Sequence, residues 1–426
     1  MRIISAIPLS TLEISLVSAV LILVFVIWRL TRHQECGYSE EPVGRIGSLR
    51  HTLAGLTHGT VTEGNKVSLI RGARFFDEVV SEMKGAGHSI HLETFLWEDG
   101  KASDMITEAL CGASLRGVEV RILADARGSS SLGGSTREKL ADAGCNLHFF
   151  HPWKIMNLGR FNIRDHRKII VIDGRTAFVG GHCITDAWLE DQKDFPVYRD
   201  ISARLEGAVV NGVQSAFAEN WIEADCNLFV TKDAFQNPVS KGGAGAHVTY
   251  IRPDGCPSSV QILHHIAIGL SKEKIRIQNP YFLPDPVGSK ALRMAARRGV
   301  DVRIMVPAVT ATDSFYIAYA GQSLYQRLLE AGVRIFEYQP TLLHQKIITV
   351  DGEWCGIGSC NFDDRSFEIN DEIMVGVFDK EVVSELDGIF EDDTPDCVEV
   401  SLEDWKQRSA FARLREKVFY LFNEQF

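Results

Sequence analysis

The chain has 426 residues, more than the roughly 250 to 300 over which a single hydrophobic core usually extends, so its length predicts two domains or a duplicated one. Hydrophobic residues make up 45% and charged residues 24% of the chain, which is typical of folded domains and excludes a disordered or collagen-like protein. The net charge of −11 argues against sequence-independent binding to nucleic acid, which needs a basic surface. Nine cysteines without a CxxC pair favour a reducing compartment over a disulfide framework or a zinc ribbon.

The first thirty residues predict a membrane anchor. Residues 9–28 contain one charge, Glu13, and twenty residues at a rise of ~1.5 Å match a hydrocarbon layer of ~30 Å. No small-x-small cleavage site follows, so an uncleaved span is favoured over a cleaved signal peptide or a buried core helix. More arginines follow the segment than precede it, which places the larger part of the chain in the cytoplasm. We expect a single-pass protein of the inner (cytoplasmic) membrane, with residues 1–30 as anchor and 31–60 as linker.

The rest of the chain is an internal duplication. Four segments of the first half recur in the second half in the same order, offset by 178 to 188 residues. The pairs are Ser89–Asp99 with Lys274–Pro284, Arg116–Leu123 with Arg298–Met305, Lys139–Phe149 with Arg327–Glu337, and His166–Gly174 with His344–Gly352. Short β-branched runs alternate with helical stretches in both halves, so the pattern predicts an α/β fold of two similar lobes whose sheets are covered by helices.

We expect the first lobe over residues 61–225 and the second over 247–400. Residues 226–246 are predicted to connect the lobes. A phosphate-binding loop would follow a strand and open a helix, whereas the glycine run in this segment follows no strong strand and opens no clear helix. Residues 401–426 predict an amphipathic helix, for which docking on the chain's own domain is favoured over lying on an anionic membrane surface. Its apolar face consists of Trp405, Phe411, Leu414, Val418, Leu421 and Phe422.

Both halves contain the pattern His-x-Lys-x4-Asp. Its residues are His166, Lys168 and Asp173 in the first half and His344, Lys346 and Asp351 in the second. Residues two apart on a strand point to the same face, so each histidine projects beside its lysine. One copy alone would be weak evidence, because a single histidine is more often a satisfied core or turn residue. Two copies allow a pseudo-twofold axis to bring four protonatable groups to one cleft, where a bound phosphate would relieve their mutual repulsion.

These residue types suit phosphodiester chemistry. The two lysines can stabilise the transition-state charge in place of a metal ion. One imidazole can attack phosphorus while the other protonates the leaving alcohol and activates the incoming one, and the residues alone leave open which imidazole attacks. Each histidine also needs a partner for its second nitrogen. We expect Glu372 to orient His344, and Asp200, or alternatively Asp194, to orient His166; the other interpretation of these acids is a solvated carboxylate at a strand end.

Other kinds of site fit poorly. Lysine is not a zinc ligand, and no further histidine or cysteine recurs at a suitable spacing, so we expect no metal and no other cofactor. The G-x-S-x-G elbow of serine hydrolases is absent from the sequence. The pair His264–His265 lies in an apolar helical run and is interpreted as packing or a domain contact.

The doubled motif resembles that of the phospholipase D superfamily, over residues 60–400. Within it the chain is most similar to the bacterial cardiolipin synthases, which also have an N-terminal membrane segment. The similar strings are Phe178–Gly181, Trp188–Leu189, Tyr198–Asp200, Leu205–Gly207, Gly358–Asp363 and Arg365–Ser366. The resemblance implies two α/β/α sandwich lobes with one metal-free active site between them. It also implies a phosphatidyl-histidine intermediate on His166, with His344 as general acid and base.

Phosphate contacts are expected from Gly181, Ser359 and Asn361. One departure from the family pattern is Cys183, which stands where the first half would carry the counterpart of Asn361. Because a thiol is a weaker donor than an amide, we expect backbone groups or a looser contact to hold phosphate on that side.

We therefore expect a membrane-anchored phosphatidyltransferase of the cardiolipin synthase type. It would move a phosphatidyl group from phosphatidylglycerol, or a related phospholipid, to the hydroxyl of a second phosphatidylglycerol or another alcohol. Hydrolysis of phospholipid by the same site is the alternative. The anchor and the acidity disfavour cleavage of nucleic acid, which is not an expected partner, and the two intact motifs disfavour a non-catalytic membrane scaffold.

Overall fold

The computed structural model describes residues 15–20, 22–23, 44–153, 162–193, 196–225, 227–228, 234–251 and 257–423. The chain divides into two compact units, residues 1–37 and 38–426. Of the first unit, residues 15–20 and 22–23 are described; they are helical and exposed. The predicted membrane segment therefore lies largely outside the described residues. Within the part of the chain that is described, no helix is both long and apolar enough to cross a bilayer.

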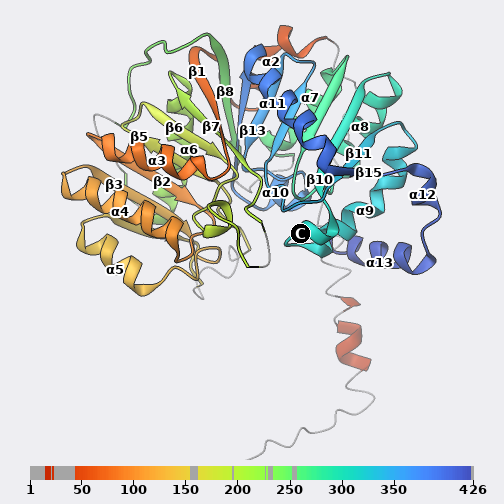
Figure 1. Ribbon diagram of the computed structural model, residues 1–426, viewed down its shortest axis with the longest axis horizontal. Helices are drawn as coiled ribbons and strands as arrows, with labels where there is room; N and C mark the ends of the chain where they lie inside the picture. The colour runs from red at the N-terminus through yellow and green to blue at the C-terminus, as the bar shows by residue number, and fades with distance from the viewer. Residues whose placement is uncertain are drawn as a thin grey trace, which may run out of the picture. The chain divides into compact units, whose positions relative to one another are not determined.

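The second unit is built on one mixed sheet (Figure 1). Its strands in the first half are β1 (Thr62–Arg71), β2 (Ser89–Thr94), β3 (Glu119–Asp125), β4 (Asn146–Phe150), β5 (Ile169–Ile172), β6 (Thr176–Gly180) and β7 (Ile201–Glu206). Those of the second half are β8 (Ala244–Ile251), β9 (Lys274–Gln278), β10 (Asp301–Pro307), β11 (Arg334–Tyr338), β12 (Ile347–Val350), β13 (Trp354–Gly358), β14 (Glu372–Phe378) and β15 (Cys397–Glu399). Their order is β15-β11-β10-β9-β12-β13-β14-β8-β1-β7-β6-β5-β2-β3-β4. The halves thus share a continuous sheet, joined where β8 pairs antiparallel with β1.

Helices cover the sheet. The α-helices after the first unit are α2 (Arg50–Leu56), α3 (Arg74–Gly85), α4 (Lys101–Leu115), α5 (Gly134–Asp142), α6 (Val209–Asp225), α7 (Ser259–Leu270), α8 (Pro286–Arg297), α9 (Phe315–Leu329), α10 (Asp364–Glu368), α11 (Lys380–Asp393), α12 (Leu402–Lys406) and α13 (Ala410–Tyr420). Short 3-10 turns are η1 (Ile46–Ser48), η3 (Asp186–Trp188), η4 (Val309–Ala311) and η5 (Thr394–Asp396).

The motif strands are buried on both faces. Along β5, Ile169 and Val171 join a core that includes residues of α6 and α11, whereas Ile170 and Ile172 join a separate core with α3 and α4. This alternation is the two-residue period of a strand, and burial on both sides explains why the run contains no polar residue. The predicted α/β architecture with helix-covered sheets is confirmed for the residues described.

The duplication appears in the strand pairing. In the first half β2 pairs parallel with β3 and antiparallel with β5, and β9 pairs in the same way with β10 and β12 in the second. Each motif strand then forms a hairpin, β5 with β6 and β12 with β13. Of the predicted connection, residues 227–228 and 234–243 belong to no helix or strand, while β8 begins at Ala244, inside the glycine run.

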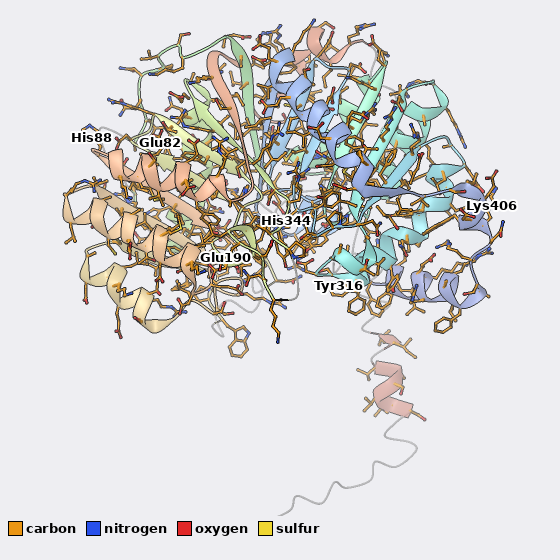
Figure 2. All side chains as sticks on the ribbon, in the orientation of Figure 1. Glu82, His88, Glu190, Tyr316, His344 and Lys406 are labelled. Atoms are coloured by element: carbon orange, nitrogen blue, oxygen red, sulfur yellow. The ribbon has the colours of Figure 1, made fainter. Side chains whose placement is uncertain are left out.

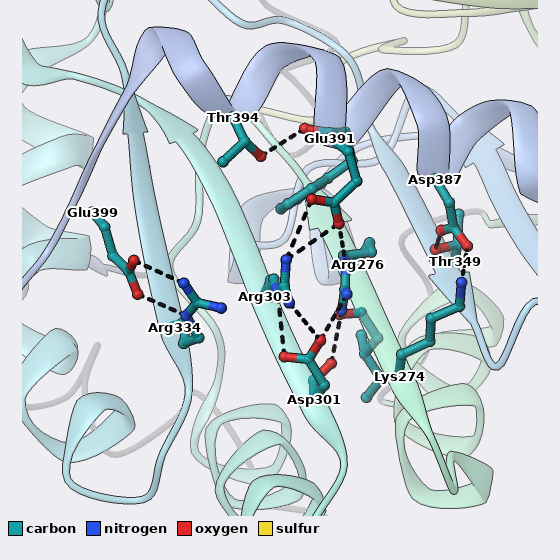
Figure 3. Close-up of polar contacts among 12 residues, drawn as sticks. Lys274, Arg276, Asp301, Arg303, Arg334, Thr349, Asp387, Glu391, Thr394 and Glu399 are labelled. Atoms are coloured by element: carbon teal, nitrogen blue, oxygen red, sulfur yellow. Dashed lines mark hydrogen bonds and ion pairs between the residues drawn. The ribbon is translucent and has the colours of Figure 1, made fainter.

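Helix α11 is held to the second half of the sheet by a polar network (Figure 3). Arg276 of β9 pairs with Asp301 at 2.7 Å, and Arg303 of β10 reaches Glu391 of α11 at 3.2 Å. The acidic partners are substantially exposed, so each pair adds on the order of 1 kcal/mol or less, and the apolar core beneath α11 provides the larger share of the packing free energy.

The predicted C-terminal helix is in fact two helices, α12 and α13. Residues 407–409 separate them, because Ser409 begins a new helix by accepting a hydrogen bond from the backbone N–H of Ala412. Helix α13 docks on α9, where the rings of Phe419 and Tyr319 stack with centroids 5.8 Å apart.

Candidate active site

The two motif histidines lie at the start of their strands and are fixed by the opposite half of the chain. The backbone N–H of His166 donates to the carbonyl of Asp371 at 3.0 Å, and that of His344 donates to the carbonyl of Arg199 at 2.7 Å. Both segments form parallel bridges there, between Asp165 and Asp371 and between Leu343 and Arg199. Each motif is therefore attached to the segment of the other half that carries a candidate acid.

The carboxylate partners are crossed relative to the prediction. His166 Nδ1 lies 2.8 Å from Glu372 Oε1, and His344 Nδ1 lies 2.9 Å from Asp200 Oδ2. The expectation that Glu372 orients His344 and Asp200 orients His166 is wrong. Glu372 follows the bridge to the first motif and Asp200 follows the bridge to the second, whereas the prediction assumed partners within one lobe. The rival residue Asp194 lies outside the described residues.

The two carboxylates have different electrostatic environments. Burial would raise the pKa of Asp200, but the nearby His182, His344 and Lys346 outweigh burial and hold it below its ordinary value, so this group stays ionised. Burial raises the pKa of Glu372 to about 7, despite opposition from Lys168. The pair His344–Asp200 therefore carries a fixed negative charge, whereas Glu372 beside His166 is only partly ionised near pH 7.

Two of the three predicted phosphate ligands support these carboxylates. A side chain at Gly181 would collide with the carboxylate of Asp200, so glycine there allows Asp200 to approach. Ser359 Oγ donates to Glu372 Oε2 and accepts from the backbone N–H of Ile373 at 3.1 Å. Asn361 is buried, and its Oδ1 has no hydrogen-bond partner among the described residues. Phosphate binding by these residues remains a prediction.

Cys183 also lies near the site. Its thiol is buried and points to the carbonyl of Gly181, with Sγ 3.8 Å from the oxygen. Burial raises the pKa of this thiol, so it stays protonated and neutral at physiological pH. It therefore fills space beside the site without adding a negative charge.

The lysines lie beside their own histidines. Lys346 Nζ is 2.9 Å from His344 Nε2 and 2.6 Å from the His344 carbonyl oxygen. Lys168 Nζ is 2.7 Å from the His166 carbonyl oxygen and 5.4 Å from the centroid of the Phe95 ring. In the second motif the histidine and lysine side chains therefore lie side by side.

The crossed hydrogen bonds bring the two motifs together, and the pKa shifts of the two histidines agree with this arrangement. Burial, followed by the charges of Lys168 and Lys346, lowers the pKa of His166 well below its ordinary value. Burial and Lys346 lower the pKa of His344 to about 4, with a further contribution from Lys168 and opposition from Asp200. Each lysine thus acts on the histidine of the other half, and Figure 2 places His344 where the two halves meet. Both imidazoles are therefore neutral near pH 7 in the free enzyme, the state in which an imidazole can attack phosphorus or accept a proton.

Lys346 gives the site a pH dependence. Burial, with help from Lys168 and against Asp200, lowers its pKa to about 7. Its ammonium is therefore charged below pH 7 and is lost as the pH rises, so phosphate affinity should fall. We expect kcat/KM to decrease between pH 7 and pH 9, by up to tenfold per pH unit, because kcat/KM reports the free enzyme.

The Lys346→Arg variant is the control for this profile. Its guanidinium stays protonated throughout the range, so the alkaline decrease should vanish even if the rate is lower. A wild-type profile that is flat to pH 9 would contradict the assignment.

The motif aspartates lie at the end of the motif strands away from the histidines. Asp173 accepts hydrogen bonds from the backbone N–H groups of Gly87, His88 and Ser89, at 2.7 to 3.0 Å. Asp351 does the same for residues 272–274, at 2.8 to 3.0 Å. A strand of four residues separates each aspartate from its lysine, about 16 Å of chain at ~3.3 Å per residue. This geometry favours a structural role for both aspartates, which end the motif strand and fix the start of the neighbouring strand. Their catalytic role stays a prediction.

The Asp173→Asn variant tests this structural role. Asparagine tolerates the positive φ of 54° at this position but removes the charge from the hydrogen bonds. We expect the free energy of unfolding to fall by about 1 kcal/mol, measured by chemical denaturation, with specific activity retained. A variant of normal stability that has lost turnover would instead return Asp173 to the catalytic machinery.

Two aromatic residues of the site were not predicted. The Phe95 ring centroid lies 5.1 Å from that of His166, and the Trp188 ring centroid lies 4.9 Å from that of His344. Trp188 Nε1 also donates to Asp200 Oδ2 at 2.8 Å. Phe95 directly follows β2, at the strand end nearest the motif, which is the signal in the sequence that would have located it. In the described part of the chain, no group of three or more His, Cys, Asp or Glu side chains could hold a metal ion.

Comparison with known proteins identifies the family. A family model described as "Cardiolipin synthase, PLD-like domain" matches residues 79–204 and 265–394. The chain belongs to this cardiolipin synthase family. Cardiolipin synthase 2 of Bacillus cereus is 33% identical over 398 residues, which cover 93% of this chain and 75% of the relative. The cardiolipin synthase of Geobacillus kaustophilus is 34% identical over 353 residues, 82% of this chain and 70% of the relative.

Solved structures support the same fold. The phosphatidylserine synthase of Haemophilus influenzae Rd KW20 superposes with a TM-score of 0.68 at 14% identity, covering 84% of this chain and 95% of that one. The polyphosphate kinase of Porphyromonas gingivalis gives 0.55 at 14% identity, over 88% and 53% of the two chains. The predicted phospholipase D-like fold and the predicted phosphatidyltransferase of the cardiolipin synthase family are confirmed.

Proposed function

We propose that the enzyme transfers a phosphatidyl group from phosphatidylglycerol to the terminal hydroxyl of a second phosphatidylglycerol, through a covalent intermediate on His166. The observation that carries this proposal is the crossed arrangement of the site, in which each imidazole is held by a carboxylate of the other half while both lysines act on both histidines. As a member of its family the enzyme is associated with the membrane and acts on phospholipid.

In the first step, neutral His166 attacks phosphorus with Nε2. Its Nδ1–H donates to Glu372, which stabilises the positive charge that develops on the ring. The bond from phosphorus to the glycerol oxygen breaks, and His344 supplies the proton that the departing alkoxide needs. The bound phosphodiester is anionic, and Asp200 is ionised, so both favour a protonated His344 once substrate is in place.

In the second step, the hydroxyl of the acceptor lipid gives its proton to His344 and attacks phosphorus. The bond between phosphorus and nitrogen breaks, which returns neutral His166 and leaves the phosphatidyl group on the acceptor oxygen. Lys168 and Lys346 stabilise the charge on the phosphoryl oxygens in both steps.

The burial of the site favours transfer over hydrolysis. His166 is 8% and His344 is 7% exposed, so little water has access to the intermediate.

We further propose that the N-terminal segment is a single membrane span of the inner membrane and that the catalytic lobes lie on its cytoplasmic side.

An assay with labelled phosphatidylglycerol tests the proposal. Purified full-length enzyme should form labelled cardiolipin and release glycerol, and added glycerol should reverse the reaction. Phosphatidic acid as the sole labelled product would establish the hydrolase instead. Cleavage of DNA without lipid turnover would reject both lipid functions.

A further inference from the structure

Helix α13 packs on its domain through an unexpected side. The docked side carries Phe419 and two charged residues, Arg415 and Glu416. The Arg415 guanidinium lies 3.6 Å from the centroid of the Tyr319 ring, and Glu416 is 3% exposed and paired with Arg408. An amphipathic helix that only stabilised its own domain would bury its apolar stripe instead.

The apolar stripe of α13 faces outward. We call it the C-terminal apolar face; its residues are Phe411 (74% exposed), Leu414 (59%), Val418 (45%), Leu421 (59%) and Phe422 (46%). The spacing places these residues on one side of the helix. Phe315, at the start of α9, is a further exposed apolar residue at 53%, and its ring contacts Phe419 on the docked side of α13, with centroids 6.2 Å apart. A contiguous apolar patch of this kind marks an interaction surface.

The charges beside this face are positive. Arg413 and Lys417 are exposed, and with Arg408, Ala410 and Leu414 they line a groove of about 300 Å³. Glu416 is the one acidic residue between positions 407 and 423, and its ion pair with Arg408 neutralises it. In a chain with a net charge of −11, this is a local basic surface directly adjoining an apolar one.

The face is connected to the active site. Asn423 Nδ2, just after α13, donates to Asp364 Oδ2 at 3.1 Å. Asp364 begins α10, and the next residue, Arg365, is among the charges that lower the pKa of His166. The segment that carries the apolar face is thus fastened to the element that borders the nucleophile.

We propose that the C-terminal apolar face docks into the surface of a bilayer rich in anionic phospholipid, with the groove around Arg413 and Lys417 holding a lipid phosphate. The apolar side chains enter the acyl boundary, and the guanidinium and ammonium groups meet the anionic headgroups. A second copy of this chain fits less well, because the same positive side chains would oppose each other across the contact. This proposal adds a membrane-binding surface to the proposed function. It depends on the proposed function only for the class of lipid, an anionic phospholipid, that the surface would meet.

Photocrosslinking tests the proposal in the full-length chain. The photoreactive residue p-benzoylphenylalanine replaces Phe411, and in a control chain it replaces Leu115, which is 77% exposed at the end of α4. Both chains also carry His166→Ala, so that labelling does not depend on turnover. In vesicles containing phosphatidylglycerol, we expect at least about fivefold more lipid adduct at position 411 than at position 115.

Equal labelling at both positions would overturn the proposal, as would adducts at position 411 that consist of a second copy or of the chain's own N-terminal segment. In a further arm, the double variant Arg413→Gln and Lys417→Gln should lower the lipid adduct about tenfold, because each cation near an anionic surface favours binding. An unchanged yield would overturn the role of the groove. Failure of the transfer assay with normal crosslinking would count against the proposed function alone.

Discussion

Replacing His166 with alanine is expected to lower cardiolipin formation by on the order of 10⁴-fold or more, and replacing His344 should have a similar effect. Loss of His166 removes the group that attacks phosphorus, and loss of His344 removes the group that gives a proton to the leaving alcohol and takes one from the acceptor alcohol. Because the two histidines act together, either change should stop the reaction. The measurement is the rate of labelled cardiolipin formation, together with the labelled lipid that stays covalently bound after rapid denaturation. His166→Ala should carry no bound label.

The matched control is His264→Gln. His264 is buried in α7, and its ring packs against Phe362 and Phe367, outside the proposed chemistry. This variant should keep most of its activity per folded molecule. Bound label that persists in His166→Ala and disappears in His344→Ala would reverse the assignment of the two histidines.

Glu372→Gln and Asp200→Asn should each lower turnover by about 10²-fold, since loss of an orienting carboxylate misplaces the imidazole and its proton. The crossed contacts predict different consequences for the two variants. Asp200 raises the pKa of His344, so Asp200→Asn should lower that pKa and move the activity profile to lower pH. Glu372→Gln should slow the appearance of bound label on His166.

Asp285→Asn is the control for both acids. Asp285 is also a buried carboxylate paired with a histidine, His265, with 3.0 Å between oxygen and nitrogen, but the pair lies outside the active site. It caps α8, so a loss of stability without a change in pH profile is expected. A pH profile altered equally by Asp285→Asn and Asp200→Asn would remove the specific role of Asp200.

Much of the fold could be predicted from sequence because the duplication repeats local patterns. Apolar strand runs such as Ile169–Ile172, glycine-terminated helices and the Asp-Gly hairpin turns are encoded within short segments. The continuous sheet could not be predicted in this way, because the pairing of β1 with β8 joins residues about 180 positions apart and no local signal specifies it. The two C-terminal helices depend on the Ser409 cap, which a longer apolar periodicity obscured.

The sequence predicted the reacting histidines and lysines of the site, but it did not predict which carboxylate orients each histidine. The chemistry of the reacting groups follows directly from their residue types, which are the imidazoles of His166 and His344 and the ammonium groups of Lys168 and Lys346. The carboxylate partner of each imidazole depends instead on which segment of the chain lies beside the motif in the folded structure. The bridges at Asp371 and Arg199 show that this segment comes from the other half. The motif aspartates are the opposite case, because the turn that both halves share is enough to explain their constant spacing from the lysine.

The crossed carboxylates also bear on how such a duplicated enzyme can be divided or shuffled. A fragment ending before β8 would keep His166 but lose Glu372, and the complementary fragment would keep His344 but lose Asp200. Each fragment alone would therefore lack the carboxylate that orients its own imidazole. It would regain an oriented imidazole only by pairing with a second half, its complement or another copy, that supplies a carboxylate across the join between β1 and β8. An exchange of one half between related enzymes therefore requires that the incoming acid reach the imidazole of the other half.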